Sequence, residues 1–113
     1  MDFSTFCNRL GKLDGLQNVD KALAILLWFE KEDPGIEISA GSLSRMLKDH
    51  GLGGPNSTKL SENLAKTKRV LKGSNGFRLK ADAKSVVYKL IEKIFEDELP
   101  EVNQKNGFLP EDI

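Results

Sequence analysis

Positively charged side chains are concentrated in residues 56–80, and their spacing groups several of them on one surface. Lys59, Asn63 and Lys66 are three or four residues apart, so on a helix they project from the same face. Basic and amide side chains grouped in this way attract and hold anionic partners. A basic face that is simply solvated is the alternative interpretation.

The overall charge is balanced, with 17 basic and 17 acidic residues, but its distribution is uneven. Residues 57–93 carry ten Lys or Arg against three acids, a net of +7. Residues 94–113 carry six acids against Lys105, a net of −5, and residues 1–56 have a net of −2. Such asymmetry within one chain indicates a charged partner better than the overall pI does.

The residue types needed for catalysis are scarce. The single histidine, His50, and the single cysteine, Cys7, are too far apart in sequence for a zinc cluster of usual spacing. The glycines of residues 51–54 lack the lysine that follows a phosphate-binding loop. Cys7 lies beside an apolar helix face, so we expect a buried thiol. We expect no enzyme active site, no cofactor and no metal.

The length of 113 residues fits one domain. No apolar run approaches the ~20 residues that a membrane-spanning helix needs, and the N-terminus lacks the features of a secretory signal. One cysteine cannot form an internal disulfide, which favours a reducing compartment. We therefore expect a cytoplasmic protein without membrane contact.

The elements that position the basic residues can be read from hydrophobic periodicity. We expect a helix over residues 3–13 with Ser4 as its cap, and a second helix from Asn18 or Asp20 to about Asp33. The second helix is apolar all round over residues 22–29, which predicts a core position and makes Trp28 a core or interface anchor.

Residues 36–38 alternate in the manner of a short strand, which could lie as a third strand beside a later hairpin. Ser39 is expected to cap a helix that runs to about His50. After the turn of residues 52–55, a further helix over residues 56–69 is predicted, with its apolar side buried and its basic side exposed.

A β-hairpin is expected over residues 70–80. A three-residue loop over residues 74–76 would pair Leu71 with Leu79 and Lys72 with Arg78. Leu71, Leu79 and Phe77 would then share the core face, because side chains alternate along a strand. The other face would carry Lys72, Arg78 and Lys80.

The last helix is expected to begin at Asp82 as cap and to end near Leu99 before Pro100. Its apolar stripe would be Val87, Leu90, Ile91 and Ile94. Residues 100–113 are acidic and aperiodic, so they are expected to be a tail or the start of a linker to a further domain.

This order of elements resembles the winged helix-turn-helix superfamily over roughly residues 19–95. The segments that carry the resemblance are ISAGSLSRMLKDHGL, PNSTKLSENLAKTKRV and RVLKGSNGFRLK. The chain also looks like the winged helix-like N-terminal domain of some larger bacterial proteins, including defence-related ones. The expected fold is mainly α with a small β-hairpin or three-stranded sheet, in one domain over residues 1–99 that includes the extra helix 3–13.

The resemblance implies that residues 56–69 form a recognition helix in the major groove of DNA and that residues 70–80 form a wing on the adjacent backbone. It implies base or phosphate contacts from the helix and phosphate contacts from the wing. The candidate residues are Ser57, Lys59, Asn63 and Lys66 on the helix, and Lys72, Arg78 and Lys80 on the wing.

Two functions remain open at this point. The first is binding of double-stranded DNA through a continuous basic surface. The second is a winged-helix module for protein contact or self-association, which would require an exposed apolar patch around Trp28 and Phe29 or on the first helix.

Overall fold

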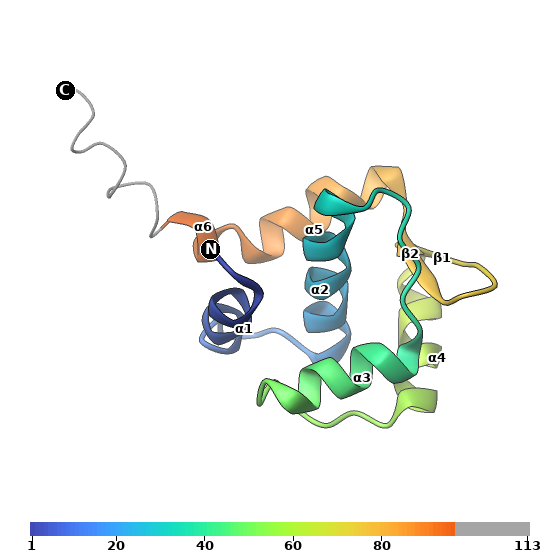
Figure 1. Cartoon of the computed structure of the whole chain (residues 1–113), viewed down its shortest axis with the longest axis horizontal. Helices are drawn as coiled ribbons and strands as arrows, with labels where there is room; N and C mark the ends of the chain where they lie inside the picture. Colours follow the sequence, from blue (N-terminus) through green and yellow to red (C-terminus); the bar gives the residue numbers. More distant parts are fainter. Residues whose placement is uncertain (97–113) are drawn as a thin grey trace.

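A computed structural model describes residues 1–96, and residues 97–113 lie outside the described part. Within residues 1–96 the protein is mainly helical, with one two-stranded antiparallel sheet (Figure 1). None of the helices in this range is long and apolar enough to cross a bilayer. The elements in chain order are α1 (Phe3–Gly11), α2 (Asn18–Glu32), α3 (Ala40–Asp49), α4 (Ser57–Thr67), β1 (Val70–Lys72), β2 (Phe77–Leu79), η1 (Ala81–Ala83), α5 (Lys84–Ile91) and α6 (Lys93–Glu96).

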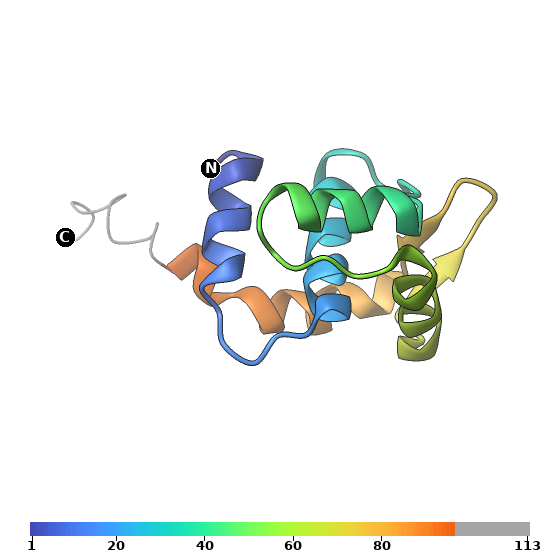
Figure 2. The same ribbon diagram turned by 90° about the horizontal axis from the view of Figure 1, so that it is seen from below.

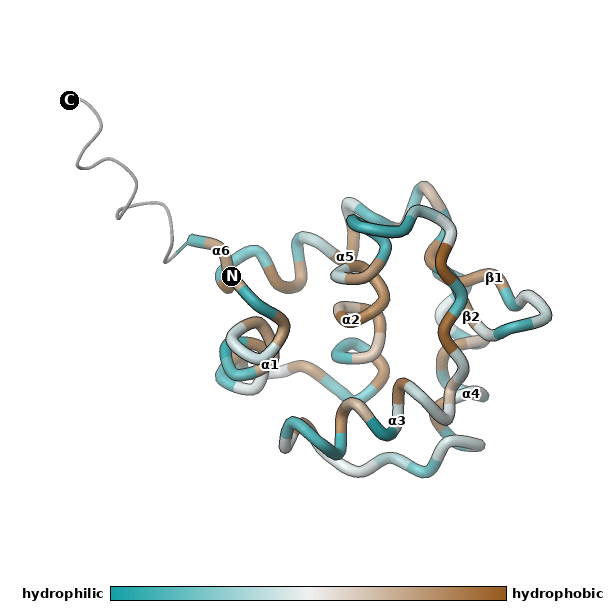
Figure 3. Tube along the Cα trace, viewed as in Figure 1, coloured by the Kyte–Doolittle hydropathy of each residue, from teal (hydrophilic) through white to brown (hydrophobic). Residues whose placement is uncertain are grey.

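Helix α2 is the centre of the core, as its all-round apolar sequence predicts. The five side chains of residues 22–26 are fully buried, and α2 packs against α3, α4, α5 and β2. Apolar residues lie along α2 and within both strands, whereas the hairpin turn is polar (Figure 3). A helix in contact with neighbours on several sides needs apolar residues on every side that is covered.

Helix α1 packs on this core through Phe6, Cys7 and Leu10, which are fully buried. The expectation that Ser4 caps α1 is wrong, because the Asp2 carboxylate accepts the backbone N–H of Thr5 at 2.8 Å and takes the capping position. The buried thiol at Cys7 is confirmed, and burial raises the pKa of Cys7 to about 11. The thiol is therefore protonated at neutral pH and inert.

The capping of α3 by Ser39 is confirmed, since its hydroxyl accepts the backbone N–H of Ser42 at 3.1 Å. The segment before it forms less sheet than expected. Ile38 makes a single antiparallel bridge to Phe77, with both backbone hydrogen bonds at 2.9 Å, so the third strand is reduced to one residue.

Helix α4 ends two residues earlier than predicted. The Asn56 side chain caps its start by accepting the N–H groups of Thr58 and Lys59. At the other end, the Thr67 hydroxyl donates to the Leu64 carbonyl and accepts the N–H of Arg69. Lys68 adopts a left-handed conformation with φ of 59° and terminates the helix.

The predicted hairpin register is wrong by one residue. The structure pairs Val70 with Leu79, Leu71 with Arg78 and Lys72 with Phe77, around a four-residue turn. The turn covers residues 73–76 and is closed by a backbone hydrogen bond of 2.7 Å from Gly73 to Gly76.

The physical reason is the early end of α4. The left-handed residue at Lys68 sets the phase of β1 so that Val70, at 8% exposure, enters the core and Leu71, at 40%, points outward. Val70 and Leu71 are both apolar, so the hydrophobic pattern cannot distinguish the two registers.

The last helical region is broken into η1, α5 and α6 rather than continuous. Asp82 lies inside η1 and caps nothing, and Leu90 is 37% exposed, so both expectations are wrong. Val87, Ile91 and Ile94 are buried as expected. The predicted ending near Leu99 and Pro100 and the acidic tail fall outside the described residues.

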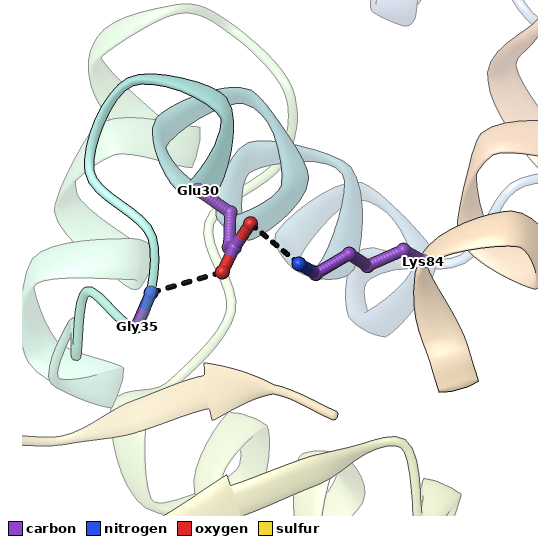
Figure 4. A network of polar contacts seen from close by, with 3 residues as sticks. All are labelled: Glu30, Gly35 and Lys84. Atoms are coloured by element: carbon purple, nitrogen blue, oxygen red, sulfur yellow. Dashed lines mark hydrogen bonds and ion pairs between the residues drawn. The ribbon is translucent and has the colours of Figure 1, made fainter. Parts of the chain in front are cut away.

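One buried carboxylate ties α2 to α5. Glu30 accepts the backbone N–H of Gly35 at 2.9 Å and forms an ion pair of 3.0 Å with Lys84 (Figure 4). The hydrogen bonds from Gly35 and then from Lys84 hold the pKa of Glu30 below its ordinary value of 4.5, and the charge of Lys84 adds to this effect. Glu30 therefore links the end of α2 to the start of α5 as an anion.

This lowered pKa predicts a pH-dependent stability. Because the folded pKa is below the unfolded value, the contribution is complete above pH 4.5 and is lost as the pH falls through the folded pKa. Glu30→Gln is expected to lower the free energy of unfolding by about 1 kcal/mol at neutral pH, since Gln still accepts a hydrogen bond but lacks the charge.

Urea unfolding of both proteins at neutral pH and at several values below pH 4.5 measures this difference. The gap between them should shrink toward the acid end. A gap that stays constant over the whole range would contradict the ionic role of Glu30.

Candidate nucleic-acid interface

Helix α4 and the hairpin lie at one end of the molecule, opposite α1 and α6 (Figures 1 and 2). The turn of the hairpin projects from the body of the protein beside α4 (Figure 1). Strand β1 follows α4 closely in sequence and packs on it. All seven residues predicted from the sequence therefore belong to this end.

The outward side of α4 carries the predicted helical residues. Lys59 and Lys66 are exposed, and Asn63 is half-buried between them. Leu60 and Leu64 are buried on the opposite side and fix the rotation of the helix on the core. The structure thus brings the three polar residues onto one accessible face of α4.

Ser57 begins α4 and lines a separate cleft at the junction with α3. Arg45 and Lys48 line the same cleft, and both are exposed. The sequence reasoning did not include these two cations. The sequence feature that could have identified them is their spacing of three residues on a helix whose Leu43 and Leu47 face inward.

The observed register defines the outer face of the hairpin differently from the prediction. Arg78 lies opposite Leu71, and the Lys80 N–H donates to the Arg69 carbonyl at 3.0 Å, which continues the ladder by one pair. Alternation then places Arg69 and Lys80 on the same face as Arg78. Arg69 was missed because the predicted helix included it.

Lys72 does not belong to this face. It pairs with Phe77, and its Nζ lies 5.7 Å from the centroid of the Phe77 ring. Val70, Phe77 and Leu79 are the buried residues of that inner face. The predicted grouping of Lys72 with Arg78 and Lys80 is therefore wrong, since the register is shifted by one residue.

The cations at this end have no ion-pair partner among residues 1–96. In the part of the chain that the structure describes, Lys59, Lys66, Arg69, Arg78 and Lys80 form no ion pair. Residues 57–80 contain seven basic residues and one acid, Glu62. We call the five unpaired cations of α4 and the outer hairpin face the basic surface.

One acid from outside this segment reaches the hairpin turn. The Glu37 carboxylate accepts the backbone N–H of Asn75 at 3.0 Å. The negative charge of Glu37 repels a phosphate group at the tip of the turn. Attraction of an anion is therefore stronger along the strands and α4 than at the tip.

Metal-ligating residues are not grouped within residues 1–96, where no three His, Cys, Asp or Glu side chains are placed to hold an ion. The His50 ring packs nearly perpendicular to the Phe3 ring, with centroids 5.1 Å apart. His50, at the end of α3, therefore joins the contacts that Phe3 of α1 makes with Trp28 and Phe29 of α2.

An apolar groove lies away from the basic surface, between α2 and the α5–α6 region, and has a volume of about 660 Å³. Trp28 lines it and is partly exposed, whereas the α1 residue in its lining, Phe6, is fully buried and Phe29 packs against Phe3 instead. Its apolar lining consists of Phe6, Leu27, Trp28, Tyr88, Ile91 and Phe95.

Comparison with known proteins adds no family to this description. The chain has no significant match among protein-family models, curated proteins or solved structures. The resemblance to winged helix-turn-helix proteins therefore stays an expectation from the order of elements and the segments of the sequence.

Proposed function

We propose that this protein is a non-catalytic winged-helix module that binds double-stranded DNA through the basic surface. Helix α4 serves as the recognition helix, and the hairpin serves as the wing. The observation that carries the proposal is the set of five unpaired cations on adjacent elements at one end of the molecule.

The chemistry of these residues favours phosphate over base contacts. Lys59, Lys66 and Lys80 act as point charges and position the protein on the DNA backbone. Asn63 and the arginines are able to form two hydrogen bonds with the edge of one base. Asn63, however, is half-buried on α4. We therefore propose that affinity comes mainly from charge and that sequence preference is modest.

Salt dependence tests this proposal. Binding of a generic duplex, followed by fluorescence anisotropy, is expected to show a slope of log K against log salt of about −4 to −5, because five phosphates are neutralised. Between 50 and 200 mM salt, this slope lowers the affinity by about 250- to 1,000-fold. Absence of binding at low salt, or binding that does not change with salt, would refute it.

The apolar groove favours a second candidate function, contact with protein. None of its lining residues belongs to α4 or the hairpin. DNA binding and groove occupancy can therefore be measured independently. Substitutions in one surface should leave the other intact.

A further inference from the structure

The apolar groove is large enough to hold side chains and is left open by the described residues. Its volume of about 660 Å³ lies within the range of ligand-binding pockets. Tyr88 on its wall is 45% exposed and stacks on Phe95, with ring centroids 5.6 Å apart. A large exposed aromatic surface of this kind is stabilised when an apolar group covers it.

The rim of the groove is positively charged. Lys31 Nζ lies 5.6 Å from the ring centroids of both Trp28 and Phe95, where the ring faces attract it. Lys89 is exposed and also lines the groove. Among the lining residues, Glu92 is the one acid that offsets Lys31 and Lys89, while the lining residue Lys84 is paired with Glu30. The rim therefore selects an apolar group that is accompanied by carboxylates.

The sequence after Glu96 contains a group of this composition. Phe108 and Leu109 are adjacent apolar residues, and Glu111 and Asp112 follow them closely. Residues 97–113 carry five acids and one Lys. We propose that the segment around Phe108 and Leu109 docks in the apolar groove of its own chain, with its carboxylates against the lysines of the rim.

The position of the groove makes this contact accessible. Phe95 lines the groove, so the chain leaves the described fold beside it. Residues 97–107 form a connection of 11 residues, and the 12 steps from Glu96 to Phe108 span up to about 40 Å when extended.

Tethering also reduces the affinity that is required. A short flexible linker gives an effective concentration of about 1 mM, so a contact with a dissociation constant of about 1 mM is already half occupied. Phe108 and Leu109 need only modest burial to reach this strength.

The single tryptophan of the chain reports on the groove. Trp28 lines it, and no other tryptophan contributes to the fluorescence. In the full chain, the double variant Phe108→Ser/Leu109→Ser is expected to increase acrylamide quenching of Trp28 by about twofold, because a groove that was at least half occupied becomes open. Its far-UV circular dichroism should match that of the unmodified chain.

A matched control and a rescue distinguish the possible occupants. Val102→Ser removes an apolar side chain from the same segment and should leave the quenching unchanged. A synthetic peptide of residues 105–113, added at about 1 mM to the double variant, should restore the protection.

Two outcomes would overturn the proposal. Equal quenching of Trp28 in the unmodified chain and the double variant would show that the segment does not cover the groove. Protection that disappears on dilution of the unmodified chain would instead identify a second copy as the occupant. Both results are independent of DNA binding, which is measured on another surface.

Discussion

Arg69→Glu is expected to weaken binding to duplex DNA by about 60-fold at ~0.1 M salt. Removing one phosphate contact costs about eightfold at this salt, and reversing the charge doubles the effect on a logarithmic scale. The strand pairing continues from Leu71 and Arg78 to Arg69 and Lys80. Arg69 therefore lies on the outer hairpin face, which belongs to the proposed interface. The slope of log K against log salt should become shallower by about 1 to 2.

Lys72→Glu is the matched control, since it makes a similar change of charge three residues away. Lys72 is exposed, but it lies over the Phe77 ring on the face of the hairpin opposite to Arg69 and Arg78, so its replacement should lower the affinity by less than about eightfold. The three-residue loop predicts the reverse order, with Lys72 on the basic face. Fluorescence anisotropy on the two variants, with folding checked by circular dichroism, therefore tests the register together with the interface.

Equal losses from the two variants would show that only the total charge of the hairpin matters. No loss from Arg69→Glu would remove the outer hairpin face from the interface. In that case, only α4 would remain as the proposed DNA-contacting element of residues 56–80.

Gly76→Ala is expected to lower the free energy of unfolding by about 3–5 kcal/mol, as measured by urea denaturation. Gly76 has φ of 143°, a conformation that residues with a Cβ rarely adopt. A Cβ at this position would also collide with the peptide group between Ile38 and Ser39. Backbone strain and steric overlap therefore add, and the bridge between Ile38 and Phe77 is lost.

Gly15→Ala separates these two effects. Gly15 also has a positive φ, 83°, but nothing lies within 4 Å of an added Cβ. Its replacement should cost about 1 kcal/mol, from backbone strain alone. Similar losses at the two positions would argue against the close approach of the hairpin turn to residues 38–39.

Most of the fold follows from local sequence signals. The all-round apolar run of α2 and the cap at Ser39 each depend on neighbouring residues, so they could be predicted. The start of α1 could not be fixed in this way, because Asp2 and Ser4 are both suitable caps and only the geometry selects Asp2.

The candidate site was predictable on α4 and less so on the hairpin. Lys59, Asn63 and Lys66 share a face whatever the length of the helix. The assignment of Lys72 and Arg69 depends on where the helix stops, which is decided by the Thr67 hydroxyl and the left-handed conformation of Lys68. A lysine in that conformation has no distinctive sequence signal.

The contact between Glu37 and the hairpin turn also bears on the order of folding. The carboxylate and the Asn75 N–H that it accepts are 38 positions apart, and the bridge from Ile38 to Phe77 spans a similar distance. Isolated two-stranded hairpins are marginally stable, and closing a loop of this length costs entropy before the contact forms. The hairpin is therefore expected to acquire its shape late, after the helices have brought residues 37–38 into place.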